Sequence, residues 1–350
     1  MGRLSPLLLG LKEELKNIKK YDIPWSRRLW LYRHGFTSSR DILYEINKGN
    51  IDNYLSDIQQ VKSTRQLYRN ISSKIAADKY IYHVLMGEVY PEHVPELIAG
   101  YKPGHGVVRF PGRSVDSLEE LIAELERRGS VVIKRKGGGG GRDVHVLESD
   151  GGNLFFDGDV IEATELWNSL ESSPESIVTE YIAQADYSEK IYPTSANTIR
   201  FLTMVDPETD TLFPAAAIHR FGATGSKIDN WSAGGMSAKV DIEKGELGMG
   251  IVRSNTGEVE RVTHHPDTGE AITGVKIPKW DEIRSKTLEI ANEFADVLTY
   301  VGWDILVTDG TGSFKIIEAN PTSQVEMIQS HQPLLADDRT RRFYEHHGVL

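Results

Sequence analysis

The chain has 350 residues, of which 39% are hydrophobic, 26% charged and 9% aromatic; this balance excludes a disordered or fibrous protein and gives room for about two domains. The formal net charge of −11 at pH 7 disfavours non-specific binding to nucleic acid or to an anionic membrane. The sequence has no cysteine, which excludes disulfides, thiolate metal sites and a cysteine nucleophile.

The apolar runs of the sequence are short. The longest, such as residues 6–11 and 213–218, fall far short of the roughly 18 to 20 residues that cross a bilayer. Residues 1–10 are too short for a signal peptide, and Pro6 departs from the myristoylation pattern. We therefore expect an unanchored cytoplasmic protein that does not insert into a membrane.

The first part of the chain, residues 7–76, is predicted to be helical, because apolar residues such as Leu11, Leu15 and Ile18 recur at helical spacing. Residues 25–40 mix arginines with tryptophans. This stretch is either a basic patch that contacts substrate or, as we favour, a helix face along which amphipathic side chains lie with their polar heads in water.

A helix followed by a β-hairpin is predicted next. Residues 117–120 form a capping box, Gly129 ends the helix, and residues 131–134 form a strand directly after it. Five consecutive glycines, residues 137–141, separate that strand from a second one that contains Val144 and Val146. The pattern predicts a hairpin with a glycine lid.

The rest of the chain alternates β and α patterns. Residues 177–182 read as a buried strand, and apolar periodicity predicts a long helix over residues 280–300. The remaining predicted strands are 198–205, 212–221, several within 236–263, 303–307 and 314–317. The last two flank a turn at residues 309–312 and form the clearest hairpin signal of the chain.

The five glycines point to phosphate chemistry. They exceed what a turn requires, and each loses extra backbone entropy when it is ordered. Such a loop can present backbone N–H groups to phosphate oxygens, and Lys134, Arg135, Lys136 and Arg142 flank it with positive charge. The run matches neither the P-loop nor the dinucleotide-binding pattern. The alternative is a flexible exposed loop.

The last hairpin carries candidate metal ligands. In a register centred on Thr311, Asp304 lies opposite Glu318, and the two-residue period puts Asn320 on the same face as Glu318. Carboxylate and amide oxygens suit Mg²⁺. A slip of one residue would send the two carboxylates to opposite faces. Solvated carboxylates stay an alternative, although both lie inside apolar runs, where an unpaired charge is costly.

Together, the glycine loop and the acidic hairpin resemble the ATP-grasp superfamily from about residue 78 to 321. Residues 32–36, 229–235 and 302–304 look most like its sugar-transfer-associated and α-L-glutamate-ligase-like branch. The resemblance implies an α+β, ATP-grasp fold in which two α+β lobes clasp ATP. The expected regions are a helical N-terminal region at 1–76, a lobe with the glycine-rich flap at 77–183, and a lobe with the metal site and the C-terminal tail at 184–350.

The resemblance also implies which residues bind the nucleotide. They are Lys79, Lys134, Gly138, Gly139, Gly140, Gly141, Glu180, Tyr181, Ile182 and Asp186. In this reading the two lysines contact phosphates and the glycines cover them. Glu180 accepts from the adenine amino group, the backbone after it meets adenine, and Asp186 is the candidate for the ribose hydroxyls.

The implied reaction centre lies later in the chain. Arg200 resembles the arginine that steadies the transferred phosphoryl group. Asp304, Glu318 and Asn320 match a triad that holds two Mg²⁺ ions, or Mn²⁺, with Glu318 bridging them.

Two further cations are candidates from the residues themselves. Arg220 and Lys227 can clamp a substrate carboxylate, in a pocket shaped by residues 229–230 and 234–235. The alternative for both is an ordinary surface loop.

These expectations lead to a carboxylate–amine ligase. A substrate carboxylate attacks the γ-phosphoryl group of ATP, giving ADP and an acyl phosphate, and an amine then displaces phosphate to form an amide. The substrates are expected to be small molecules, saccharides or peptides that bear the carboxylate and the amine. One alternative is a phosphotransferase that uses the same ATP site, and another is a non-catalytic nucleotide-binding protein. The sequence does not fix the two substrates or the oligomeric state.

Overall fold

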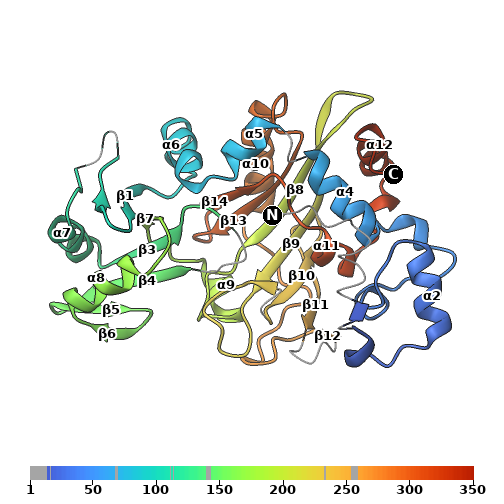
Figure 1. Cartoon of the computed structure of the whole chain (residues 1–350), viewed down its shortest axis with the longest axis horizontal. Coiled ribbons are helices and arrows are strands. Elements are labelled where there is room, and N and C mark those ends of the chain that lie inside the picture. Colours follow the sequence, from blue (N-terminus) through green and yellow to red (C-terminus); the bar gives the residue numbers. More distant parts are fainter. Residues whose placement is uncertain are drawn as a thin grey trace. The chain divides into compact units, whose positions relative to one another are not determined.

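The computed structural model describes residues 14–15, 17–67, 70–110, 112, 114–138, 143–231, 234–253 and 259–350. The chain divides into two compact units. The first comprises Met1–Lys74, Gln184–Ser313 and Asn320–Leu350, and the second comprises Ile75–Ala183 and Phe314–Ala319. Each unit combines a β-sheet with several helices (Figure 1). The expected α+β fold class is confirmed.

The second unit is built on a seven-stranded antiparallel sheet with the strand order β2-β1-β7-β3-β4-β5-β6. Its elements are α6 (Lys79–Val89), β1 (Leu97–Lys102), β2 (Gly106–Val108), α7 (Leu118–Arg128), β3 (Ser130–Arg135), β4 (Val144–Asp150), β5 (Asn153–Phe156), β6 (Asp159–Ile161), α8 (Ala163–Glu171) and β7 (Ser176–Glu180).

Local signals explain why α7 begins and ends where it does. The hydroxyl of Ser117 accepts from the backbone N–H of Glu120 at 3.2 Å, and Gly129 ends the helix with a φ of 82°. The buried stripe of α7, Leu121 and Leu125, packs into one hydrophobic cluster with α8 and with the strands of the sheet. The predicted N-cap at Ser117 and the hairpin of β3 and β4 are therefore confirmed. The capping box is not closed, because the carboxylate of Glu120 accepts from the backbone N–H of Asp116 at 2.8 Å.

The first unit has a second seven-stranded sheet, in the order β12-β11-β10-β9-β8-β13-β14. Its elements are α2 (Trp25–Arg33), α3 (Arg40–Leu43), η1 (Ile51–Asn53), α4 (Asp57–Leu67), α5 (Ile71–Ala76), α9 (Asp186–Ile191), β8 (Ile199–Asp206), β9 (Thr211–Phe221), β10 (Met236–Val240), β11 (Leu247–Arg253), β12 (Val259–Val262), α10 (Trp280–Glu293), β13 (Tyr300–Val307), β14 (Phe314–Asn320), α11 (Glu326–His331), η3 (Leu334–Ala336) and α12 (Asp338–His346). The last two residues of α5 and all of β14 except Asn320 belong to the second unit.

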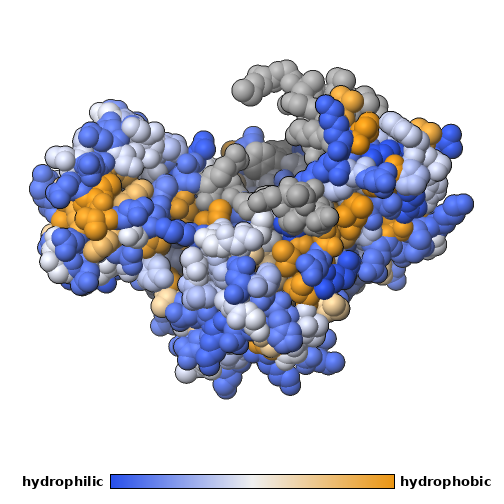
Figure 2. Space-filling model, turned by 90° about the horizontal axis from the view of Figure 1, so that it is seen from below, coloured by the Kyte–Doolittle hydropathy of each residue, from blue (hydrophilic) through white to orange (hydrophobic). Residues whose placement is uncertain are grey.

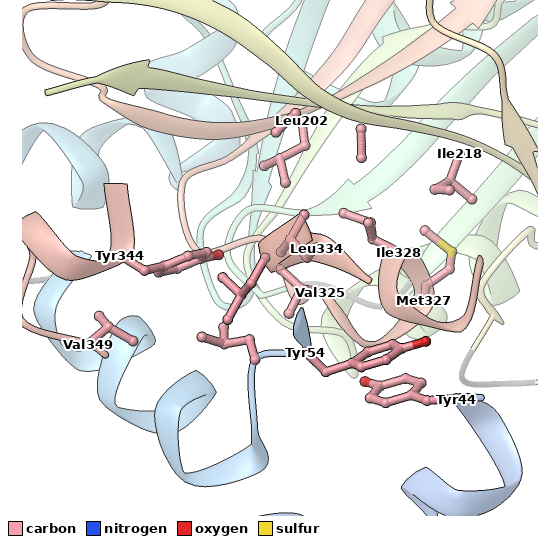
Figure 3. Close-up of a cluster of buried hydrophobic side chains, with 14 of the residues drawn as sticks. Tyr44, Tyr54, Leu202, Ile218, Val325, Met327, Ile328, Leu334, Tyr344 and Val349 are labelled. Atoms are coloured by element: carbon pink, nitrogen blue, oxygen red, sulfur yellow. The ribbon is translucent and has the colours of Figure 1, made fainter. Parts of the chain in front are cut away.

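One hydrophobic core joins both ends of the chain to this second sheet. Leu31 near the N-terminus, Leu202 in β8 and Phe343 in α12 are members of the same buried cluster. Figure 3 shows the rings of Tyr44 and Tyr54 side by side, with centroids 5.2 Å apart, beneath side chains from the strands and from the C-terminal helices. The N-terminal helices are thus part of the core of the first unit.

The structure corrects one predicted element. The helix expected over residues 280–300 ends at Glu293, and Tyr300 is already the first residue of β13. Phe294 and Leu298 continue the apolar pattern, but the backbone turns there, with Leu298 N–H donating to the carbonyl of Phe294 at 2.8 Å. A β-branched residue, Val297, lies between them, and such side chains are poor helix formers.

No helix among the described residues combines the length and the apolar character needed to cross a bilayer. The face drawn in Figure 2 is hydrophilic over most of its area, with hydrophobic patches between.

Candidate functional site

Strand register brings three charged side chains to one face of the sheet in the first unit. Asp304 in β13 pairs with Arg200 in β8, and Arg200 pairs with Ile218 in β9. Arg220 lies two residues beyond Ile218, so the period of two places it on the same face. Two cations and one carboxylate from three adjacent strands therefore converge.

The carboxylate of Asp304 is almost completely buried, at 3% exposure, and accepts hydrogen bonds on both oxygens. Arg200 donates from Nε to Oδ1 at 2.5 Å and from Nη2 to Oδ2 at 3.2 Å. Arg220 donates from Nη2 to Oδ2 at 3.1 Å, and Asn320 donates from Nδ2 to Oδ2 at 3.3 Å. This single carboxylate thus receives four donors.

The two arginines keep Asp304 ionised. Burial on its own would raise the pKa of this carboxyl, because a charge is costly to remove from water. The guanidinium groups of Arg200 and Arg220 outweigh that effect and hold the pKa below its ordinary value. Asp304 is therefore a carboxylate at neutral pH.

Each arginine has a further partner. Arg220 donates from Nε to the hydroxyl of Thr198 at 3.0 Å and forms an ion pair with Asp229 at 3.4 Å. Asp229 in turn accepts from the backbone N–H and the hydroxyl of Thr198, at 2.9 and 2.5 Å. Arg200 donates from Nη1 to the hydroxyl of Ser323 at 2.9 Å.

Gly302 leaves the space that this arrangement needs. A Cβ on Gly302 would lie 2.6 Å from Oγ of Ser323 and 2.8 Å from Cδ of Arg200, which is closer than atoms approach in folded proteins. The Gly302 position lies two residues before Asp304, on the same face of β13. A larger residue at position 302 would therefore collide with the side chains of Ser323 and Arg200.

In the second unit, Lys79 connects three segments. It is the first residue of α6, which Asp78 caps by accepting from Ile81 N–H at 3.1 Å. The ammonium group of Lys79 donates to the carbonyl of Gly138 at 2.7 Å and to Oε1 of Glu318 at 3.0 Å. Lys79 is only 7% exposed. The predicted phosphate-contacting lysine thus lies at the start of the glycine run.

Of the predicted flap, Gly138 is described, with a φ of 98° that favours glycine. Gly139, Gly140 and Gly141 lie outside the described residues. Nothing about their predicted contact with phosphate is therefore tested.

Lys134 lies in the sheet of the second unit, and its charge acts with that of Lys79 on one histidine. It lies in β3, opposite Val144 in β4 and Ile177 in β7, and is buried. His83 lies one helical turn after Lys79. Burial lowers its pKa to about 3, and the charges of Lys134 and then Lys79 contribute to this shift. The two lysines therefore create a common positive field around a neutral histidine.

The predicted adenine-contacting segment follows β7. The carboxylate of Glu180 accepts from the backbone N–H of Glu96 at 2.9 Å and pairs with Lys315 at 3.3 Å. Tyr181 is half-exposed, and Asp186 is an exposed residue of α9 in the first unit. The roles of Glu180, Tyr181, Ile182 and Asp186 stay predictions.

Lys227 lies in the connection between β9 and β10 and is exposed. Its predicted role as a carboxylate clamp also stays a prediction. The role of Arg220 stays a prediction as well; its guanidinium bonds to Thr198, Asp229 and Asp304.

The predicted metal triad is divided between the units, with Asp304 and Asn320 in the first and Glu318 in the second. The amide nitrogen of Asn320 donates to Asp304, and carboxylate and amide oxygens are the ligand types that Mg²⁺ takes. Within the described residues, no three or more histidine, aspartate or glutamate side chains gather as a metal-binding group. The triad stays a prediction that rests on two carboxylates and one amide.

Sequence reasoning placed Asp229 in a pocket with Arg220 but did not predict their ion pair, and it missed the anchors Thr198 and Ser323. Thr198 lies two residues before Arg200, and a polar residue at that spacing on a strand is a usable signal. Ser323 lies far away in sequence from Arg200, and no local pattern marks it; Asp229 follows Arg220 by nine residues, in the connection after β9.

Both sheets, from β1 to β14, lie within the part of the chain that one family profile matches. The sequence profile described as "sugar-transfer associated ATP-grasp" matches residues 59–338, most of the chain. The chain therefore belongs to the sugar-transfer associated ATP-grasp family, and the expected resemblance is confirmed.

The solved structures that match this chain share little sequence with it. N5-carboxyaminoimidazole ribonucleotide synthetase, as an ADP complex, is 13% identical over 72% of this chain and 46% of that chain, with a TM-score of 0.39. D-cycloserine synthetase is 13% identical over 78% and 69%, with a TM-score of 0.39. Biotin carboxylase from Campylobacter jejuni is 14% identical over 77% and 46%, with a TM-score of 0.42.

This chain spans about half the length of the first of these solved chains. A search of curated proteins gave no match.

Proposed function

We propose that this protein is an ATP-dependent carboxylate–amine ligase that forms an amide through an acyl phosphate and releases ADP and phosphate. The proposed carboxylate belongs to a saccharide, an amino acid or a peptide. The observation that carries the proposal is the buried Arg200–Asp304–Arg220 cluster in a chain of the sugar-transfer associated ATP-grasp family. Such a cluster supplies positive charge for an anion and an ionised carboxylate for a cation.

The proposed first step is attack of the substrate carboxylate on the γ-phosphoryl group of ATP. When bound, ATP and Mg²⁺ supply that group and neutralise part of its charge. In the first unit, Arg200 is the group proposed to stabilise negative charge on the transferred phosphoryl group. In the second unit, Lys79 and Lys134 are proposed to bind nucleotide phosphates, with the glycine flap excluding water.

The proposed second step is attack of an amine on the acyl phosphate. The bond between the acyl carbon and the phosphate oxygen breaks, phosphate leaves, and the amine loses a proton as the amide forms. This route needs no protein nucleophile, in agreement with a sequence that has no cysteine.

The test is hydroxamate formation. Purified protein is incubated with Mg-ATP, with hydroxylamine as a surrogate amine, and with pools of amino acids, uronic acids or peptides as carboxylates. Hydroxylamine traps an acyl phosphate whatever the natural amine is. A hydroxamate that depends on one pool supports the proposal and identifies the class of carboxylate. ADP release into a stable phosphorylated product, without hydroxamate, would instead support the phosphotransferase alternative.

Two variants separate catalysis from folding in this assay. Glu318→Ala removes the proposed bridging ligand and is expected to abolish hydroxamate formation at saturating Mg²⁺. Glu282→Ala removes an exposed carboxylate in the first turn of α10 and serves as the matched control. Full activity of Glu318→Ala would contradict the proposed site.

A further inference from the structure

Two arginines share the Asp304 carboxylate, and they differ in what else holds them. Their side chains are equally buried, at 13% exposure for Arg200 and 12% for Arg220. Both come from neighbouring strands and both donate to Asp304. Burial alone therefore gives no reason for the two residues to behave differently.

Their other partners are unlike. Arg220 has a second carboxylate, Asp229, and shares the hydroxyl of Thr198 with it. The other printed partner of Arg200 is the neutral hydroxyl of Ser323. Arg220 is thus paired with two anions, whereas Asp304 is the one anion bonded to Arg200 among the described residues.

Each arginine of this cluster has an anionic partner only while Asp304 bonds to Arg200. Arg200 and Arg220 bring two positive charges, and Asp304 and Asp229 bring two negative charges. A divalent cation that binds the oxygens of Asp304 displaces guanidinium donors, because Mg²⁺ holds its oxygen ligands at about 2.0 to 2.1 Å. Arg220 then keeps Asp229, but Arg200 is left as a buried charge without an anion, which is strongly unfavourable.

We propose that the two arginines have separate duties: Arg220, fixed by Asp229 and Thr198, is a positioning residue for Asp304, and Arg200 is released toward an anion when a divalent cation binds Asp304. The anion is a phosphoryl or carboxylate group. This inference rests on the proposed function for the identity of the cation, Mg²⁺. It assigns anion binding at this cluster to Arg200, whereas Arg220 contacts no substrate.

The experiment is arginine labelling of the full-length protein with phenylglyoxal, followed by mass spectrometry, with and without Mg²⁺ and without nucleotide. Mg²⁺ is expected to increase labelling of Arg200 severalfold and to leave labelling of Arg220 unchanged. Arg339, an exposed residue of α12 that pairs with Asp337, is the internal reference for reagent reactivity. Equal gains at Arg200 and Arg220, or no gain at Arg200 with saturating Mg²⁺, would overturn the proposal.

Asp229→Asn gives the decisive comparison. This variant keeps a side chain that can accept from Thr198 but removes the second anion of Arg220. Mg²⁺ is then expected to increase labelling at both arginines. If Arg220 stays protected in Asp229→Asn, the anchoring role of Asp229 is wrong. Circular dichroism melting, run on each variant, ensures that only folded protein is compared.

Inorganic phosphate supplies a second readout. In the presence of Mg²⁺, phosphate affinity measured by calorimetry is expected to fall severalfold in Arg200→Gln and to be unchanged in Arg339→Gln, at an exposed position of α12. Native phosphate affinity in Arg200→Gln would contradict the assignment of anion binding to Arg200. Neither measurement uses turnover, so a negative labelling result beside a positive hydroxamate result rejects only this inference, and the opposite pair of results rejects only the proposed function.

Discussion

Asp304 in the first unit and Lys79 in the second are both nearly buried charges, but different kinds of structure hold them. The partners of Asp304 come from adjacent strands, so the sheet register itself brings Arg200 and Arg220 to it. Lys79 reaches from the first turn of a helix to a carbonyl of the glycine run and to Glu318, whose side chain is 24% exposed. The first cluster is fixed by the backbone, and the second by the reach of one flexible side chain.

This difference explains what each cluster is suited to do. A group held by strand register keeps its position without a ligand, which lowers the cost of stabilising charge during a reaction. A lysine has a flexible side chain, so its ammonium group can reach phosphates in more than one position. The comparison predicts that damage to the first cluster harms folding, whereas damage to the second mainly harms binding.

The largest expected effect is that of Asp304→Asn. Removing this charge leaves two buried guanidinium groups with one carboxylate, and the free energy of unfolding is expected to fall by about 3 kcal/mol. Denaturant unfolding measures the change. Asp309→Asn, in the exposed turn of the same hairpin, is the matched control and should change stability far less. Similar values for the two variants would mean that Asp304 is not the centre of a buried charge cluster.

Asp229→Asn should have a smaller effect on stability. The variant leaves Arg220 paired with Asp304 but weakens the bonds that Asp229 accepts from Thr198, and we expect a loss of about 2 kcal/mol. The same unfolding experiment measures it. A loss as large as that of Asp304→Asn would place the centre of the cluster at Asp229 instead.

The buried histidines predict a pH dependence that involves both units. Burial is the main cause that lowers the pKa of His83, His219 and His331 to about 3. Between about pH 6.5 and pH 3 the unfolded chain binds these protons and the folded chain does not. Stability should therefore fall as the pH drops through this range, by about 1.4 kcal/mol per pH unit for each histidine at most.

His331→Asn tests this prediction in the first unit. Asparagine keeps a group that can bond to Ser237, the partner of His331 at 2.9 Å. The slope of unfolding free energy against pH, measured between pH 7 and pH 5, should become shallower in the variant. An unchanged slope would show that His331 is protonated in the folded protein.

The smallest free-energy effect is expected for Lys79→Met. Loss of this ammonium group should weaken nucleotide binding by about tenfold, while the fold is retained because the methionine stem fills the same space. Calorimetry with ATP measures the affinity. Lys102→Met, on an exposed position of β1, is the control and should bind ATP like the native protein. If Lys79→Met binds ATP with native affinity, Lys79 does not contact the nucleotide phosphates.

Structural features can be predicted from this sequence where the residues that form them lie close together in the chain. The glycine run, the N-cap at Ser117 and the final hairpin can all be predicted, since their signals lie within a few residues of one another. The length of α10 cannot, because Phe294 and Leu298 continue an apolar period that the backbone does not follow. Apolar spacing alone does not show where a helix gives way to a turn.

The anchors of the arginine cluster show a second limit. Thr198 and Asp229 bond to Arg220 from positions 22 residues before it and 9 residues after it, outside the strand β9 that carries Arg220. Which carboxylate an arginine meets depends on strand order and register, and neither follows from one sequence without the pairing of β8, β9 and β13. The resemblance identified Arg200 and Asp304, but it did not reveal their mutual contact.

The core shared by Leu31, Leu202 and Phe343 has a consequence for synthesis. Leu31 and Phe343 lie about 310 positions apart, and at about 5 to 20 residues per second a ribosome needs roughly 15 to 60 s to add that many residues. The helix that carries Leu31 is therefore made well before Phe343, which packs in the same core. The first unit cannot complete this core until Phe343 has emerged, and until then the apolar face around Leu31 stays exposed to chaperones and proteases.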